Sequence, residues 1–153
     1  MHKKLRIDKI RLIVYIDLMQ TFLPYSNFWQ SAECLDYRRL GKQRVEAYQI
    51  LNTLQGKSKG WKNHPAVSMW KGYEDALKMY MNVCILTWMS RGYKNTMQLA
   101  VDIDFENYKE PPWLGNPEFH ASHRSNLLRK NEEFYRKFGW LEPTDLEYIW
   151  PST

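Results

Sequence analysis

Basic and imidazole side chains that could bind phosphate gather in two stretches of the chain. The first stretch contains Arg38, Arg39, Lys42 and Arg44, and the second contains His120, His123, Arg124, Arg129 and Lys130. Such clusters are typical of surfaces that contact a nucleic-acid backbone, although a charged run can also be the solvated face of a helix. Their occurrence twice in one small chain favours the first interpretation.

The histidines allow two further interpretations. His64 lies in an Asn63-His64-Pro65 turn, where its ring could contact a phosphate or base edge or simply bond to the backbone. His120 and His123 form a His-x-x-His pair that can share one helical face, but no Cys or carboxylate stands at the usual spacing for further ligands. We therefore expect no metal and no cofactor. The sequence also has no phosphate-binding glycine loop, dinucleotide fingerprint or Gly-x-Ser-x-Gly elbow.

Helical spacing predicts the element that carries the first basic cluster, from Ser31 as N-cap to Leu54. On a helical wheel the apolar arc contains Cys34, Tyr37, Leu40, Gly41, Val45, Tyr48 and Leu51. The outer face contains Arg38, Arg39, Lys42, Glu46 and Gln49. Glu33 and Arg44 fall inside the apolar arc, so we expect them to border the core or to line a cleft.

Other helices are predicted further along the chain. The clearest runs from Tyr73 to Trp88 and stops at Gly92, and another begins at Asn116-Pro117-Glu118. A short helical turn is expected around 66–70, and a last helical pattern ends at Gly139. Residues 94–110 are ambiguous. These signals predict an all-α fold, a compact single-domain bundle of three to five helices with long loops.

Composition limits the class of protein. The chain has 153 residues, 44% hydrophobic and 25% charged, which suits one globular domain. Two separated cysteines give no disulfide framework, so we expect a cytoplasmic protein with buried thiols. The net charge of +5 and the 15% of aromatic residues favour nucleic acid as the partner. Residues 12–16 form an apolar run too short to span a bilayer, and could be a short strand or an extension.

Several motifs together resemble a known family. They are Met19-Gln20-Thr21-Phe22-Leu23-Pro24, the run from Leu35 to Glu46, Asn63-His64-Pro65-Ala66-Val67, Pro111-Pro112-Trp113-Leu114-Gly115 and His120-Ala121-Ser122-His123-Arg124-Ser125. They resemble small bacterial and phage proteins assigned as pyrimidine-dimer DNA glycosylases, a group remotely similar to phage endonuclease V. The resemblance covers nearly everything from Met19 onward.

The resemblance implies a helical, DNA-binding enzyme that acts on damaged double-stranded DNA, a glycosylase with an associated lyase activity. In that family the amine of the processed N-terminus attacks the sugar C1′ and forms a Schiff base, and a carboxylate on the first helix assists. A terminal amine has a pKa of about 8, so it is partly unprotonated at neutral pH. The implied DNA-binding residues are Arg38, Arg39, Lys42, Arg44, His64, His120, His123 and Arg124, in a monomer.

The chain departs from the family pattern at two points. The resemblance begins at Met19, so residues 1–18 are interpreted as an N-terminal extension and 19–153 as one helical domain. Gln20 and Thr21 are then the candidates for the amine. Arg39 stands where the phage enzyme has Glu, so Glu46 or Glu33 must supply the carboxylate. The alternatives are a nucleic-acid or nucleotide-binding module that has lost its nucleophile, and a protein that binds a protein partner through its aromatic segments.

Overall fold

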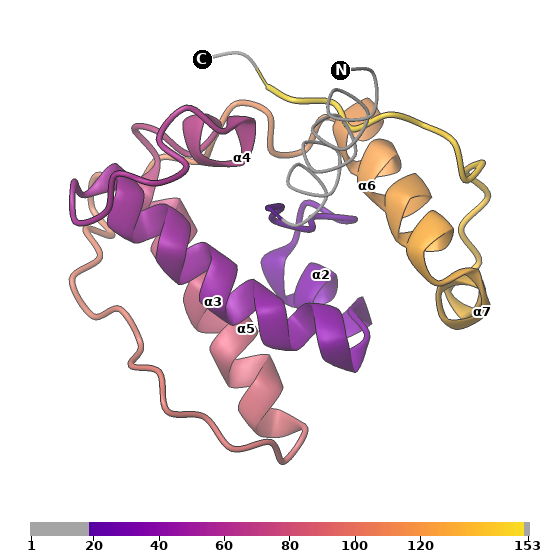
Figure 1. Cartoon of the computed structure of the whole chain (residues 1–153), viewed down its shortest axis with the longest axis horizontal. Helices are drawn as coiled ribbons and strands as arrows, with labels where there is room; N and C mark the ends of the chain where they lie inside the picture. Colours follow the sequence, from indigo (N-terminus) through magenta and orange to yellow (C-terminus); the bar gives the residue numbers. More distant parts are fainter. Residues whose placement is uncertain (1–18, 152–153) are drawn as a thin grey trace, which may run out of the picture.

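The computed structural model describes residues 19–151, and every regular element in that range is a helix (Figure 1). The longer helices are α2 (Phe28–Cys34), α3 (Tyr37–Leu54), α5 (Glu74–Ser90) and α6 (Pro117–Lys130). Two single turns, α4 (Pro65–Ser68) and α7 (Glu132–Tyr135), and the 3₁₀ helix η1 (Arg136–Phe138) complete them. The all-α prediction is confirmed. The expectations for residues 1–18, including the apolar run at 12–16, lie outside the described range.

The predicted helix from Ser31 to Leu54 is in fact two helices. Leu35 has an extended backbone (φ −71°, ψ 139°), and Asn27 rather than Ser31 caps α2. Asp36 opens α3, and its backbone N–H donates to the Tyr135 hydroxyl at 3.1 Å. The break is therefore fixed by a residue from the far end of the chain, which local periodicity cannot reveal.

The predicted ends of the later helices agree with the structure. Asn116 caps α6, because its Oδ1 accepts from the backbone N–H groups of Glu118 and Phe119, both at 3.0 Å. Pro117 occupies the first turn, where no backbone donor is needed. Gly92 and Gly139 follow the ends of α5 and η1 with φ of 86° and 75°, the left-handed region that favours glycine.

Helices α3 and α5 form the main packed pair, and Gly41 explains how closely they approach. A Cβ built on Gly41 would stand 3.1 Å from the Trp88 ring, so a larger residue would force the indole to shift by a few tenths of an ångström. The close contact with Trp88 thus accounts for a glycine within the helix, despite a propensity cost of roughly 1 kcal/mol. The core then extends through α6, where Leu127 and Leu128 are fully buried.

The buried face of α3 agrees in part with the predicted one, which included Leu40 and Leu51. It carries Leu40, Gln43, Ala47, Ile50 and Leu51. Tyr37, Val45 and Tyr48, which the wheel placed inside, are exposed. The wheel followed the larger apolar side chains, whereas the close packing against α5 selects small Ala47 and polar Gln43. As a result, aromatic and basic side chains share the outer face of α3.

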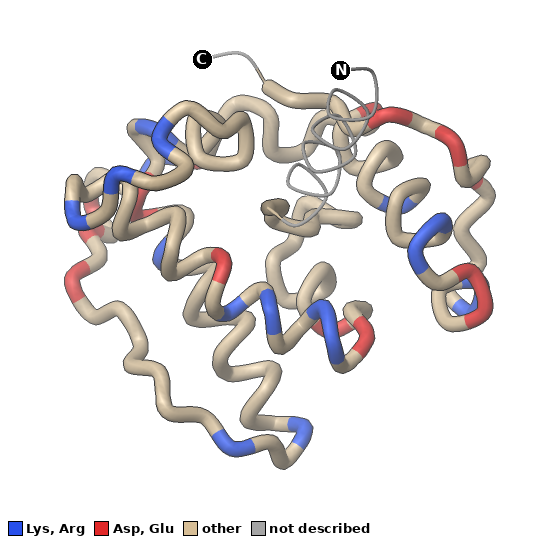
Figure 2. The backbone as a smooth tube through the Cα atoms, in the orientation of Figure 1, with Lys and Arg blue, Asp and Glu red and all other residues tan. Residues whose placement is uncertain are grey.

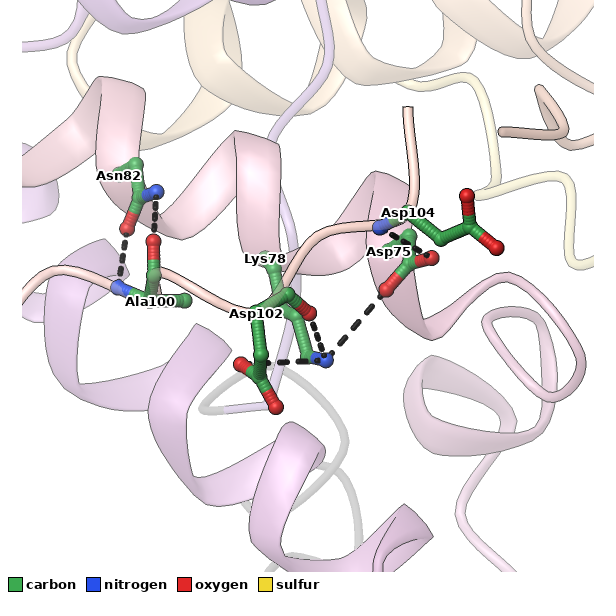
Figure 3. A network of polar contacts seen from close by, with 6 residues as sticks. All are labelled: Asp75, Lys78, Asn82, Ala100, Asp102 and Asp104. Atoms are coloured by element: carbon green, nitrogen blue, oxygen red, sulfur yellow. Dashed lines mark hydrogen bonds and ion pairs between the residues drawn. The ribbon is translucent and has the colours of Figure 1, made fainter. Parts of the chain in front are cut away.

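The ambiguous segment 94–110 has no helix and runs alongside α5 (Figure 3). Asn82 holds it by a reciprocal pair of bonds with the backbone of Ala100, at 2.8 and 2.9 Å. The Lys78 ammonium donates to the Asp102 carbonyl at 2.9 Å and to Asp75 Oδ1 at 3.3 Å. Polar contacts therefore fix an extended segment that has little apolar burial of its own.

Two further sequence expectations concern the cysteines and the membrane. Cys34 and Cys84 are both buried free thiols, as predicted. Between residues 19 and 151, no helix is long and apolar enough to cross a bilayer.

Candidate active site

The segment from Met19 to Pro24 enters the middle of the molecule between α3 and α6 (Figure 1). All six of its residues are buried. The backbone N–H of Leu23 donates to His123 Nδ1 at 3.0 Å, and the Leu23 carbonyl accepts from His120 Nδ1 at 2.7 Å. The two imidazoles of α6 thus hold both polar groups of one residue and fix the course of the segment.

Glu46 of α3 lies at the start of this segment. The backbone N–H of Gln20 donates to Glu46 Oε2 at 3.2 Å, and Gln43 Nε2 donates to the same oxygen at 3.2 Å. The structure therefore places the main-chain nitrogen of residue 20 beside a carboxylate 26 positions away. Both groups were candidates from the sequence, and the fold brings them together.

The surroundings of Glu46 change its acidity. Burial raises the pKa of Glu46 to about 7, while the Gln20 amide and the positive charges of Lys42 and Lys130 act in the opposite direction. A carboxyl group with a pKa near 7 can exchange protons at neutral pH in either direction. The site thus has the property expected of a general acid or base.

A groove of about 420 Å³ opens on the outer side of α3, next to Glu46. Its lining is Tyr37, Arg38, Gly41, Lys42, Val45, Glu46, Gln49 and Trp88. Tyr37 is 55% exposed and stacks on Trp88 with ring centroids 5.3 Å apart. Arg38 and Lys42 are exposed, as predicted. Figure 2 shows basic positions along α3, and Glu46 is the acidic residue of this helix. The carboxylate therefore borders a groove with aromatic and basic walls, which suits a nucleic acid.

Arg44 and Arg39 are held within the protein instead of standing free. The Arg44 guanidinium lies 4.2 Å from the Trp88 ring centroid, and its Nη1 donates to Asn95 Oδ1 at 3.0 Å. Arg39 pairs with Asp36 at 3.1 Å. The wheel correctly marked Arg44 as unusual, because it supports the aromatic wall of the groove from behind.

The predicted histidines lie inside the molecule. His64 is the N-cap of α4, and its Nδ1 accepts from the Ala66 N–H at 3.0 Å. Burial lowers the pKa of His64 and of His120, and it lowers that of His123 to about 3. Each of the three rings is hydrogen-bonded to backbone groups inside the molecule, which is a structural role.

Arg124 is likewise engaged within the fold. Its Nε donates to Glu142 at 2.6 Å and its Nη1 to the Pro24 carbonyl at 2.7 Å. It therefore ties the end of the buried segment to the C-terminal part of the chain. The basic group of α6 that acts on the site is Lys130, whose charge lowers the pKa of Glu46.

The other candidates for catalysis lie differently. Glu33 is exposed on α2, and its carbonyl accepts from Arg91 at 2.9 Å. The Thr21 hydroxyl accepts from Trp70 Nε1 at 3.1 Å, so its side chain belongs to the core. The Gln20 side chain is buried too, and its Nε2 finds no hydrogen-bond acceptor within the described part of the chain. Among the four candidates, the backbone of Gln20 is the main-chain group that contacts a candidate carboxylate, that of Glu46.

Sequence reasoning missed Gln43 and Tyr80. Gln43 lies three residues after Leu40 and four before Ala47, on the buried face of α3. A polar residue between two buried apolar residues of one helix indicates a side chain with specific hydrogen-bond partners. The helical wheel hid this signal, because it centred the buried face on Tyr37, Val45 and Tyr48. Tyr80 on α5 looked like one more core aromatic.

The fold and the site together define a class: a helical protein with a partly buried carboxylate beside a basic, aromatic groove. No cluster of three or more potential metal-binding side chains occurs among residues 19–151. A family model described as pyrimidine dimer DNA glycosylase matches residues 19–101. The chain belongs to the pyrimidine dimer DNA glycosylase family, and DNA is the substrate of that family. No curated protein and no solved structure matches the chain.

Proposed function

We propose that this protein excises pyrimidine dimers from double-stranded DNA through a covalent intermediate, with the amine at residue 20 as nucleophile and Glu46 as the proton-transfer group. The observation that supports this best is the 3.2 Å contact between the Gln20 nitrogen and Glu46 Oε2. A chain that begins at Gln20 would present a primary amine at that position. The amine would then have a proton acceptor within hydrogen-bond reach, which nucleophilic catalysis requires.

The reaction takes place at one sugar carbon. The amine forms a bond to C1′ as the bond from C1′ to the base breaks, and the base takes the electron pair and a proton from the Glu46 carboxyl group. The nitrogen then returns a proton to Glu46. As the sugar ring opens, the ring oxygen leaves C1′ with its bonding pair and takes that proton, which gives a protonated Schiff base. Removal of a C2′ proton then breaks the bond from C3′ to oxygen, which is the lyase step. A carboxyl group with a pKa of about 7 can accept and return each proton at neutral pH.

The groove supplies the proposed DNA contacts. Arg38 and Lys42 stand at its exposed edge, where they can pair with phosphates. The exposed ring of Tyr37, stacked on buried Trp88, offers an aromatic face to an unstacked base. Base extrusion is required for chemistry at C1′, and damage lowers its cost.

One observation favours a second candidate, a DNA-binding module without catalysis. While Met19 precedes Gln20, the nitrogen beside Glu46 is an amide, which is not nucleophilic. The basic groove would still bind DNA in that state.

A duplex with a single thymine dimer separates the two candidates. Chains that begin at Met1, at Met19 and at Gln20 are each incubated with it, and strand breaks are measured. We expect incision by the form that begins at Gln20 and much less by the form that begins at Met1. Binding by all three forms with incision by none would favour the binding module.

A further inference from the structure

Gln43 is a polar side chain on the buried face of α3, only 1% exposed. Buried amides are expensive unless every hydrogen-bonding group is satisfied. Its neighbours on that face, Leu40 and Ala47, are apolar and belong to the core. The position therefore calls for an explanation in terms of its contacts.

Four contacts determine the orientation of the Gln43 amide. Its Oε1 accepts from the Phe22 N–H at 2.9 Å and from the Tyr80 hydroxyl. Its Nε2 donates to the Gln20 carbonyl at 2.6 Å and to Glu46 Oε2 at 3.2 Å. A backbone N–H can only donate and a carbonyl can only accept, so the amide cannot be turned round.

We infer that Gln43 is the positioning residue that holds the main chain of residue 20 and the Glu46 carboxylate together. Its Nε2 bridges the two, while its Oε1 is anchored to Phe22 and to α5 through Tyr80. Glu46 Oε2 receives two N–H donors, from Gln20 and Gln43. No residue in the described range donates a hydrogen bond to Oε1, so both donors that orient the carboxylate act on the oxygen that faces the nitrogen of residue 20. The consequence for catalysis rests on the proposed function, but the positioning itself does not.

Several charged or titratable groups act on Glu46 from the surrounding elements. Lys42 on α3 and Lys130 on α6 stabilise its charged form. Tyr80 on α5 is coupled to it, and burial raises the pKa of that hydroxyl well above its usual value. Gln43 is the neutral side chain that donates to Glu46, so its effect on the Glu46 pKa can be measured by replacing its NH2 group alone.

Two variants separate positioning from ordinary packing. Gln43→Glu has the same shape and keeps an acceptor for Phe22 and Tyr80, but it replaces the donor toward Glu46 with a second carboxylate oxygen. Tyr80→Phe removes one partner of Oε1 and leaves the Nε2 contacts in place. If Gln43 served packing alone, the two variants would affect the protein similarly.

The first measurement follows the Glu46 carboxyl carbon by NMR as pH is varied, in the full chain. We expect Gln43→Glu to raise the midpoint by about one pH unit or more, because a donor to the charged form is lost and a like charge is gained. Tyr80→Phe keeps the Nε2 donor to Glu46, so it should shift the midpoint by much less than Gln43→Glu does. A wild-type midpoint in Gln43→Glu would overturn the inference.

A wild-type measurement covers the case in which Gln43→Glu does not fold. The Nε2 protons of Gln43 should change chemical shift with the same midpoint as the Glu46 carboxyl. Resonances that stay constant through the Glu46 titration would contradict the proposed bridge.

A kinetic measurement connects the bridge to the reaction. In the form of the chain that is active, Gln43→Glu should slow incision by about tenfold or more, since small misplacements of reacting groups are costly. Tyr80→Phe removes one of the two anchors of Oε1 but keeps both Nε2 donor contacts, so it should slow incision clearly less than Gln43→Glu. If no form incises DNA, the proposed function fails, whereas the NMR titrations still decide the role of Gln43.

Discussion

Glu46 is the side chain on which the proposed chemistry depends. A glutamine in its place could still accept from the Gln20 and Gln43 donors through its amide oxygen, so the fold should persist. It could not take up a proton. We therefore expect Glu46→Gln to slow single-turnover incision by about 10²–10⁴-fold while DNA affinity stays near that of the wild type.

The matched control for this prediction is Glu33→Gln on α2. Glu33 is exposed and was the other candidate from the sequence. Its substitution should leave the rate unchanged. Equal losses in the two variants, or a wild-type rate for Glu46→Gln, would contradict the role of Glu46.

At the residue scale, the sequence predicted part of the site and missed part for a definable reason. Glu46 was recognised as a possible carboxylate, and Arg44 as a charge that does not belong in bulk solvent. Gln43 was not recognised, because its value lies in contacts with Gln20 and Phe22, more than twenty positions away. Spacing along one helix carries no information about such partners.

At the scale of elements, α6 holds the buried segment Met19 to Pro24 in place through hydrogen bonds to its backbone. His123 accepts from the Leu23 N–H and is fully enclosed, and burial lowers its pKa from 6.5 to about 3. The unfolded chain therefore binds a proton that the folded chain does not between these values. The contribution of His123 to stability is present above pH 6.5 and is lost as pH falls toward 3.

Glu46 acts in the opposite sense, since its pKa is raised from 4.5 to about 7 and the folded chain binds the extra proton. The two effects oppose each other between about pH 4.5 and 6.5. The effect of Glu46 on the free energy of unfolding is the same in the wild type and in His123→Gln, so it cancels when the two proteins are compared at each pH. The stability advantage of the wild type should shrink by up to about 1.4 kcal/mol per pH unit below pH 6.5.

Denaturant unfolding of both proteins at a series of pH values measures this difference. Arg124 also lowers the pKa of His123, so ionic strength is held constant. A difference between wild type and variant that does not change with pH would show that His123 is not held neutral by burial.

The elements also show where prediction from sequence succeeds. The start of α6 was predictable because Asn116 and Pro117 act on backbone groups a few residues away. The break between α2 and α3 was not, because it depends on Tyr135. The histidines of α6 were expected at the DNA, but their partner is Leu23, about a hundred positions away.

At the scale of the whole molecule, the chain has a net charge of +5, and its basic side chains differ in whether they are paired within the fold or exposed. Arg39, Lys78 and Arg124 are paired within the fold, whereas Arg38 and Lys42 on α3 remain exposed. We expect duplex affinity to fall at least about tenfold between low and physiological salt, because bound phosphates release counterions. Reversal of Arg38 and Lys42 together should reduce both the affinity and this salt dependence, without loss of stability.

A gel-shift series over increasing salt measures this, with reversal of exposed Lys71 and Arg136 as the control pair. Neither residue lines the groove. Absence of binding at low salt, or an equal loss in the control pair, would contradict the location of the DNA surface.

The central claim is that the nitrogen of residue 20 is the group that reacts with DNA. The most direct test is to trap the reaction of the form that begins at Gln20 with borohydride, which reduces a Schiff base to a stable amine, and to map the linked residue by mass spectrometry. We predict that the DNA fragment is attached to the terminal nitrogen of Gln20. Attachment to a lysine side chain, or no adduct on a dimer-containing or abasic duplex, would contradict the account.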